Sequence, residues 1–211
     1  MRDNINEFMR RMNSLNEKEY MYNLIAYGIA PTVCGYKAST LINLSSKYKN
    51  TYKLWKENKE EFLDRVPLKH FELKRTNDSY SILFYDEDKL NETLKKKNCT
   101  KFLNNFGYKE KDSLINFLHV LKARYKEGCP HEVGLFLDIP LDDVLGFIKN
   151  DGKNYLYCGY WKVYSNVDGA MKTFKNYDWS KKEVINLIAG GKNAFQVFKL
   201  LEEYKFIAVC N

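Results

Sequence analysis

Apolar residues recur at helical spacing along most of this chain, and that pattern constrains its fold more than any other feature. The clearest example is one apolar helix face made by Leu114, Phe117, Leu118, Leu121 and Tyr125. By contrast, the segment 79–85 is rich in aromatic and branched residues, which favours a strand. Helices separated by a few strands predict an α+β fold, a single domain in which several amphipathic helices pack on a small sheet.

Local signals predict where several helices begin and end. Asn16 is suited to cap a helix, with Glu19 as its capping-box partner, and this helix is expected to stop near Gly28. A second capping box, from Ser180 to Glu183, predicts that a new helix begins there. Between these signals no repeat, low-complexity tract or linker marks a domain boundary, so residues 1–211 are expected to form one domain.

Composition and charge narrow the classes of protein to be considered. The chain of 211 residues has 34 Lys and Arg against 27 Asp and Glu, a net charge of +7. This charge suits an acidic partner protein, such as a flavodoxin, or a small anionic ligand, although a solvated basic surface without a partner is the simpler explanation, because the lysines are spread along the chain. The sequence shows neither a secretion signal nor a membrane-spanning stretch, so a cytoplasmic location is expected. Five scattered cysteines predict free thiols rather than disulfides or a zinc site.

The most distinctive part of the chain consists of three closely spaced blocks. They are Cys129–Leu137 (CPHEVGLFL), Pro140–Ile148 (PLDDVLGFI) and Cys158–Tyr164 (CGYWKVY). Nearer the N-terminus, Ala30–Lys37 (APTVCGYK) forms a fourth block. Common catalytic, nucleotide-binding and nucleic-acid-binding signatures are missing from all of them, which argues against dedicated nucleic-acid binding.

Taken together, these blocks resemble DUF3793, an uncharacterised family of clostridia and related anaerobic bacteria. The resemblance covers a core of about residues 20–174, which leaves a helical C-terminal extension of about 180–211. Asp138 and Ile139 stand where the family more often has Gly and Tyr, and Cys129 stands where an aromatic residue is expected. The resemblance identifies neither a reaction nor a cofactor, so the cofactor is unknown. The dipeptide Cys129-Pro130 also resembles a haem-ligating element, but a dipeptide alone identifies no cofactor.

Residues of two blocks are candidates for a functional site. His131 could act as general acid/base, or as a metal ligand, although adjacent residues on a helix do not form a two-ligand grip and no metal site is predicted. Glu132 could orient His131, or it could simply complement the helix dipole, as Asp142 and Asp143 are expected to do. Lys162 could meet an anion in a cleft, or it could face solvent on a strand spanning 155–164.

The aromatic residues of that strand, Tyr160, Trp161 and Tyr164, have the amphipathic character of a pocket wall. We therefore expect a binding or accessory protein, whose cleft is bounded by His131 and by these three residues and holds a small ligand or an acidic partner protein. The alternative is an enzyme in which His131 is the acid/base and Lys162 or Tyr160 stabilises an anion. Both hypotheses require the loop entering the Pro130 helix and the Trp161 strand to meet around one hollow.

Overall fold

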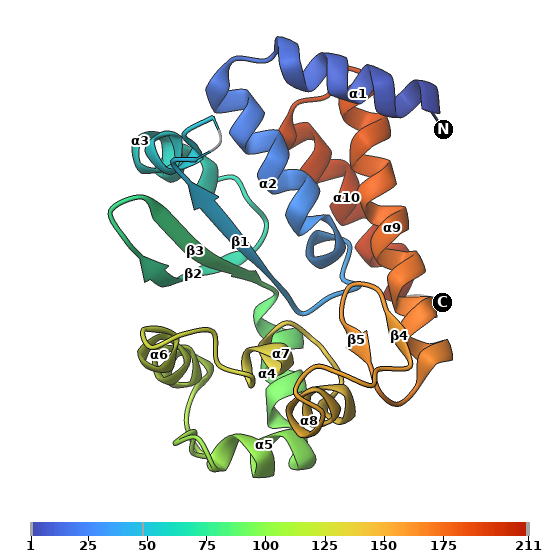
Figure 1. The fold of residues 1–211 in the computed structure, drawn as a ribbon. Helices are drawn as coiled ribbons and strands as arrows, with labels where there is room; N and C mark the ends of the chain where they lie inside the picture. Colours follow the sequence, from blue (N-terminus) through green and yellow to red (C-terminus); the bar gives the residue numbers. More distant parts are fainter. Residues whose placement is uncertain (1, 48, 210–211) are drawn as a thin grey trace.

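A computed structural model describes residues 2–47 and 49–209 (Figure 1). The elements follow the order α1 (Arg2–Ser14), α2 (Glu17–Val33), β1 (Ser39–Ser45), α3 (Thr51–Leu63), β2 (Lys69–Arg75), β3 (Ser79–Tyr85), α4 (Glu87–Lys95), α5 (Lys97–Asn104), α6 (Leu114–Tyr125), α7 (Val133–Phe136), α8 (Leu141–Lys149), β4 (Tyr157–Cys158), β5 (Lys162–Val163), α9 (Val167–Ala189) and α10 (Ala194–Val209). The predicted α+β class is confirmed. None of the described helices combines the length and the apolarity that crossing a bilayer requires.

Three antiparallel strands form the main sheet, in the order β1-β3-β2. The central strand β3 occupies the range that its composition predicts, and its side chains alternate between two buried faces. Tyr80, Ile82 and Phe84 belong to one hydrophobic core, whereas Leu83 and Tyr85 belong to a second. The sheet therefore separates two cores, and this follows from the two-residue period of a strand.

Helices from different parts of the chain cover the two faces. In Figure 1, α2, α9 and α10 lie above the sheet, and the helices α4–α8 lie below it. The core above the sheet includes Ile25 and Ile29 of α2, Val184 of α9 and Phe198 of α10. The C-terminal helices are thus part of the main core of the domain. The core below the sheet includes the predicted apolar face of α6, from Leu114 to Tyr125.

Helix α2 begins as predicted but ends later than predicted. The Asn16 side chain accepts a hydrogen bond from the Glu19 N–H at 2.9 Å, which confirms the N-cap. The expected stop near Gly28 is wrong, because α2 continues through Pro31 to Val33. Proline removes only one hydrogen bond so near the helix end, and burial of the last turn offsets that loss. Gly28 serves packing instead, since a Cβ there would lie 2.6 Å from Cδ1 of Ile42.

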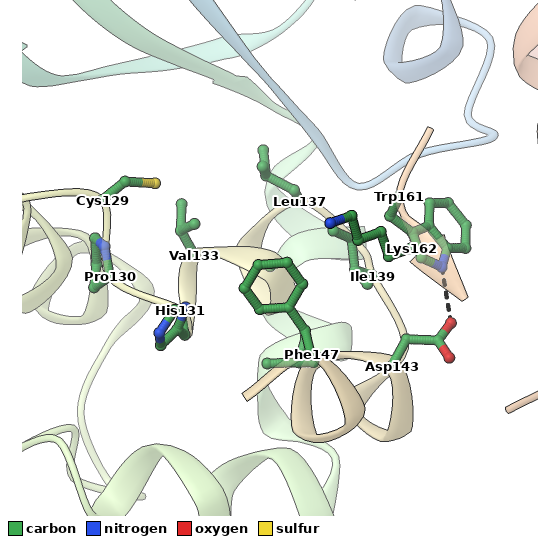
Figure 2. Close-up of a pocket in the computed structure, with 12 residues that line it drawn as sticks. Cys129, Pro130, His131, Val133, Leu137, Ile139, Asp143, Phe147, Trp161 and Lys162 are labelled. Atoms are coloured by element: carbon green, nitrogen blue, oxygen red, sulfur yellow. Dashed lines mark hydrogen bonds between the residues drawn. The ribbon is translucent and has the colours of Figure 1, made fainter. Parts of the chain in front are cut away.

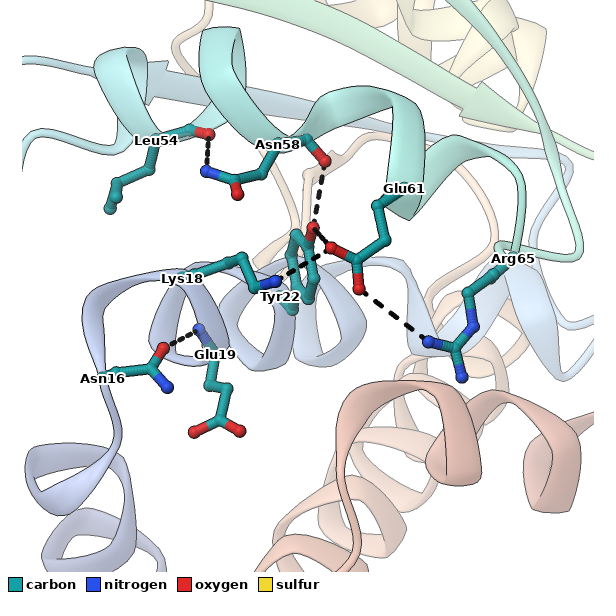
Figure 3. Close-up of polar contacts among 8 residues, drawn as sticks. All are labelled: Asn16, Lys18, Glu19, Tyr22, Leu54, Asn58, Glu61 and Arg65. Atoms are coloured by element: carbon teal, nitrogen blue, oxygen red, sulfur yellow. Dashed lines mark hydrogen bonds and ion pairs between the residues drawn. The ribbon is translucent and has the colours of Figure 1, made fainter.

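A polar contact fixes α2 against α3 (Figure 3). The Tyr22 hydroxyl donates to the Asn58 carbonyl at 2.9 Å and to Glu61 at 3.2 Å. Lys18 forms an ion pair of 2.9 Å with the same Glu61 carboxylate. Burial and the neighbouring Glu61 raise the pKa of Tyr22 to about 12, so this hydroxyl remains a donor at physiological pH.

The capping box predicted at Ser180 is wrong. Helix α9 begins after Asn166, whose side chain accepts from the Gly169 N–H, and it runs without a break past Ser180. Ser180 is buried in the middle of α9, where its hydroxyl donates to the Tyr177 carbonyl at 2.9 Å. The buried residues Phe174, Tyr177 and Val184 continue one apolar stripe through this point, so tertiary packing overrides the local signal.

Candidate functional site

A pocket of about 350 Å³ lies where the loop before α7, the helix α8 and the strand β5 meet (Figure 2). The predicted meeting of the Pro130 loop and the Trp161 segment is therefore found in the structure. Most of the lining is apolar, as is typical of ligand pockets. It consists of Cys129, Pro130, His131, Val133, Gly134, Leu137, Ile139, Asp143, Val144, Phe147, Trp161 and Lys162.

His131 lies at the edge of this pocket, and its side chain is exposed. The imidazole packs beside the Phe147 ring, with 5.6 Å between ring centroids. The helix predicted to start at Pro130 begins three residues later, at Val133, so His131 belongs to the preceding turn. A histidine in this position can contact a bound molecule and is open to solvent.

Glu132 does not orient His131, which corrects the prediction. The Glu132 side chain is only 1% exposed and forms a buried ion pair with Arg124, whose Nη2 lies 3.3 Å from Oε2. The Tyr108 hydroxyl donates to the same carboxylate at 3.3 Å. Among the described residues, Glu132 has no hydrogen bond to His131. Burial and the Glu132 charge raise the pKa of Tyr108, which keeps this phenol protonated.

Lys162 lines the pocket and is half-buried. Its ammonium group donates to the Gly152 carbonyl at 2.7 Å. The same Nζ lies 5.8 Å from the Phe147 ring and 5.2 Å from the Tyr155 ring. The loop that it holds contains positive φ angles at Asp151, Gly152 and Asn154, in keeping with the tolerance of these residue types for left-handed backbone. Lys162 therefore fixes the loop beside the pocket while its charge remains near the cavity.

Asp143 has a role that the helix-dipole prediction missed. The side chain is 2% exposed and accepts four hydrogen bonds. Oδ2 accepts from Trp161 Nε1 at 2.8 Å, whereas Oδ1 accepts from the Tyr164 N–H at 2.8 Å, and from the N–H and hydroxyl of Ser165 at 3.0 and 2.9 Å. This one carboxylate fastens the segment that carries Trp161 to α8, and in Figure 2 its bond to the indole is visible at the pocket wall.

The strand predicted over 155–164 is wrong, because this segment forms a short hairpin. Strands β4 and β5 pair through Tyr157 with Val163 and through Cys158 with Lys162. The turn between them packs tightly on α9, since a Cβ at Gly159 would lie 2.3 Å from the Phe174 ring. The reversal places Tyr160 and Trp161 in the turn between the two strands instead of within one strand.

Tyr160 and Tyr164 consequently lie outside the pocket lining, unlike Trp161. The Tyr160 hydroxyl donates to Asp178 of α9 at 2.8 Å, and burial together with this carboxylate raises its pKa. Tyr164 packs against Gly146, where a Cβ would lie 2.4 Å from the tyrosine Cβ. Its buried hydroxyl has no hydrogen-bond partner among the described residues.

Comparison with protein families identifies the chain. Residues 25–198 match the family described as "Protein of unknown function (DUF3793)", which is most of the sequence. The chain belongs to the DUF3793 family. The match extends beyond residue 174, into the two C-terminal helices. Neither the curated proteins nor the solved structures gave a significant match.

In this DUF3793 protein, the block Cys129–Leu137 supplies His131 to the pocket, and the block Cys158–Tyr164 supplies Trp161 and Lys162. The block Pro140–Ile148 supplies Asp143 and Phe147. Phe147 is the residue that sequence reasoning missed, although it contacts both His131 and Lys162. Its place near the end of the amphipathic helix α8 gave no signal of an exposed aromatic side chain. No group of three or more His, Cys, Asp or Glu side chains that could hold a metal is found within residues 2–47 and 49–209.

Proposed function

We propose that this protein is a cytoplasmic binding protein, and that its pocket holds a small, largely apolar molecule carrying an anionic group. The observation that carries the proposal is the pocket itself: an apolar cavity of about 350 Å³ with Lys162 and His131 as its accessible polar side chains. Asp143 also lines it, but its carboxylate is occupied by four hydrogen bonds. Cavities of this size and character are typical of ligand sites.

Phe147 supports the assignment of an aromatic or aliphatic ligand body. Its ring is partly exposed and lies between the His131 imidazole and the Lys162 ammonium group. A ligand packed on this ring would bring its anionic group within reach of one of these two side chains, depending on the orientation. The apolar contact supplies affinity, and the charged contact selects the orientation.

The enzyme alternative, with His131 as acid/base, has less support. An efficient histidine base is held in one tautomer by a second residue, and the predicted orienter Glu132 is committed to Arg124. Tyr160, a candidate for anion stabilisation, donates instead to Asp178. A binding role requires neither of these contacts.

A partner protein is the second candidate occupant, and a specific observation favours it. Large apolar side chains beside the pocket are exposed, including Leu145, Ile148, Tyr155, Leu156 and Tyr157, with Leu156 64% exposed. Exposed apolar clusters of this kind commonly mark protein interfaces. An acidic partner, such as a flavodoxin, would suit the net charge of +7.

The proposal can be tested with anilinonaphthalene sulfonate, a fluorescent probe with an aromatic body and one anionic group. Cys129 lines the pocket and Cys158 does not, and both thiols are exposed. Alkylation of the two thiols in the same sample, followed by peptide mass spectrometry, therefore reports where the probe binds. We expect the probe to slow alkylation of Cys129 several-fold and to leave that of Cys158 unchanged.

Variants provide the matched control. His131→Ala and Phe147→Ala should each weaken probe affinity, by about tenfold for the loss of the Phe147 ring contact. Leu156→Ala removes an even more exposed apolar side chain that lies outside the pocket, and should leave affinity unchanged. Equal alkylation of both thiols at saturating probe, or loss of affinity only in Leu156→Ala, would show that the pocket is not the site.

A further inference from the structure

A second cluster of polar side chains lies where the β4–β5 hairpin packs against α9. Lys37, in the loop after α2, places its Nζ 5.6 Å from the Tyr177 ring of α9. Tyr160 packs edge-on against Tyr177 with 5.1 Å between centroids. Lys181, one turn further along α9, lies 4.6 Å from the Tyr160 ring and 5.3 Å from the ring of Tyr27. Two ammonium groups therefore flank a block of three tyrosines.

Three donors of this cluster, the ammonium groups of Lys37 and Lys181 and the Tyr177 hydroxyl, lack acceptors. The side chains of Lys37 and Lys181 form no hydrogen bond and no ion pair with any described residue, and both lysines are half-buried. Tyr177 is 1% exposed, and its buried hydroxyl has no partner within the described part of the chain. Buried polar groups in folded proteins are nearly always paired, so the unpaired Tyr177 hydroxyl, with two unpaired lysines near it, calls for an explanation.

Nearby carboxylates do not supply the missing acceptor. Asp138 accepts from the Ala38 N–H at 3.0 Å and from Thr93 at 3.4 Å. Asp178 accepts from Tyr160. Each carboxylate is close enough to act electrostatically on one of the lysines, yet neither forms an ion pair with it. The unpaired groups are thus donors and cations, which is the complement of an anion.

The electrostatics of the two lysines agree with this geometry. Burial lowers the pKa of Lys37 to about 8, Asp138 opposes this shift, and the neighbouring charge of Lys181 lowers the pKa further. Burial also lowers the pKa of Lys181. An anion placed between the two ammonium groups would relieve their mutual repulsion and compensate for their lost hydration.

We propose that Lys37, Lys181 and the Tyr177 hydroxyl form a binding site for a small oxyanion, either a free phosphate or the phosphate or carboxylate group of a larger molecule. The site is independent of the proposed function, because none of these three residues lines the pocket. That ring lines the pocket and also contacts Tyr177, at 6.5 Å between centroids. The proposed anion site also gives a role to Lys37, the last residue of the Ala30–Lys37 block. The pocket leaves this block unexplained.

The first test uses the wild-type protein and inorganic phosphate, with chloride at equal ionic strength as the reference. Brief acetylation followed by peptide mass spectrometry measures the reactivity of each lysine. Phosphate should slow the modification of Lys37 and Lys181 at least threefold, and that of Lys175, an exposed lysine of the same helix, not at all. Acetate and a phosphate monoester, tested in the same way, distinguish a carboxylate site from a phosphate site and a free ion from a larger ligand.

Variants provide an independent readout through thermal unfolding. Phosphate should raise the Tm of the wild type and of Lys175→Met, and the increase should be lost in Lys181→Met. Tyr177→Phe removes only the unpaired hydroxyl, so it should unfold no earlier than the wild type without phosphate and should bind phosphate several-fold more weakly. Equal protection of Lys175, or no protection by phosphate, the monoester or acetate at millimolar concentrations, would overturn the proposal, whatever the outcome at the pocket.

Discussion

Replacing Asp143 with asparagine should weaken the attachment of the hairpin to α8 by a predictable amount. The asparagine carbonyl can keep the three bonds that Oδ1 accepts from Tyr164 and Ser165. The new amide N–H₂ would then face the Trp161 indole N–H, which places a donor against a donor. Loss of one charge-assisted bond, and weakening of the three others, predicts a decrease of about 3 kcal/mol in the free energy of unfolding.

Urea unfolding followed by circular dichroism measures this change. Asp142→Asn is the matched control, because Asp142 is exposed on the same first turn and should contribute through the helix dipole alone, about 0.5 kcal/mol. A double-mutant cycle isolates the bond itself. In a Trp161→Phe background no indole N–H opposes the new amide, so Asp143→Asn should cost about 1–2 kcal/mol less.

Two results would refute this reasoning. Stability of Asp143→Asn within about 0.5 kcal/mol of the wild type would mean that the four hydrogen bonds contribute little, since surface substitutions fall in that range. An equal cost of Asp143→Asn in both backgrounds would mean that the bond to Trp161 is not the interaction being lost.

Two further changes test buried charges elsewhere. Glu132→Gln leaves Arg124 without its carboxylate and should decrease the free energy of unfolding by about 2–3 kcal/mol. Lys153→Met, which breaks the exposed ion pair with Asp151, is the control and should have no measurable effect. Equal urea midpoints for the two variants would contradict this prediction. Lys37→Met should stabilise the phosphate-free protein at pH 7. The pKa of Lys37 is depressed to about 8 in the folded state, so the stability of the wild type rises between pH 8 and 10.5. The stability advantage of the variant, at most about 3 kcal/mol, should therefore disappear over that range. A constant difference in stability from pH 7 to 10.5 would contradict the lowered pKa of Lys37.

The sequence predicted those elements whose signals are local. Strand β3 and the apolar face of α6 were found because nearly every inward side chain is apolar. Strand β2 was missed because it lies at the sheet edge, where Lys69, His70 and Arg75 are exposed and hide the alternation. Ser180 was misassigned because the residues of a capping box can also occur inside a long helix such as α9. Only tertiary packing distinguishes the two cases.

The location of the candidate site was predicted correctly, but only some of its residues were. His131, Trp161 and Lys162 line the pocket as the cleft hypothesis required, although their function stays a prediction. Glu132 and Asp143 could not be assigned, because the value of a buried carboxylate depends on partners that are distant in sequence. Arg124 and the backbone after Trp161 provide those partners, and no spacing rule connects them.

The hairpin of β4 and β5 brings the block Cys158–Tyr164 next to the blocks Cys129–Leu137 and Pro140–Ile148, from which it is separate in sequence. Two strands of two residues each are too short to be stable in water by themselves, so their position must come from outside contacts. Asp143 supplies these contacts on one side, and Phe174 packs against Trp161 on the other, at 4.4 Å between centroids. Trp161 is thereby held between the pocket and the Tyr177 cluster. A change that releases the hairpin, such as Asp143→Asn, should therefore disturb both candidate sites, whereas changes at His131 or Lys181 should each disturb only one.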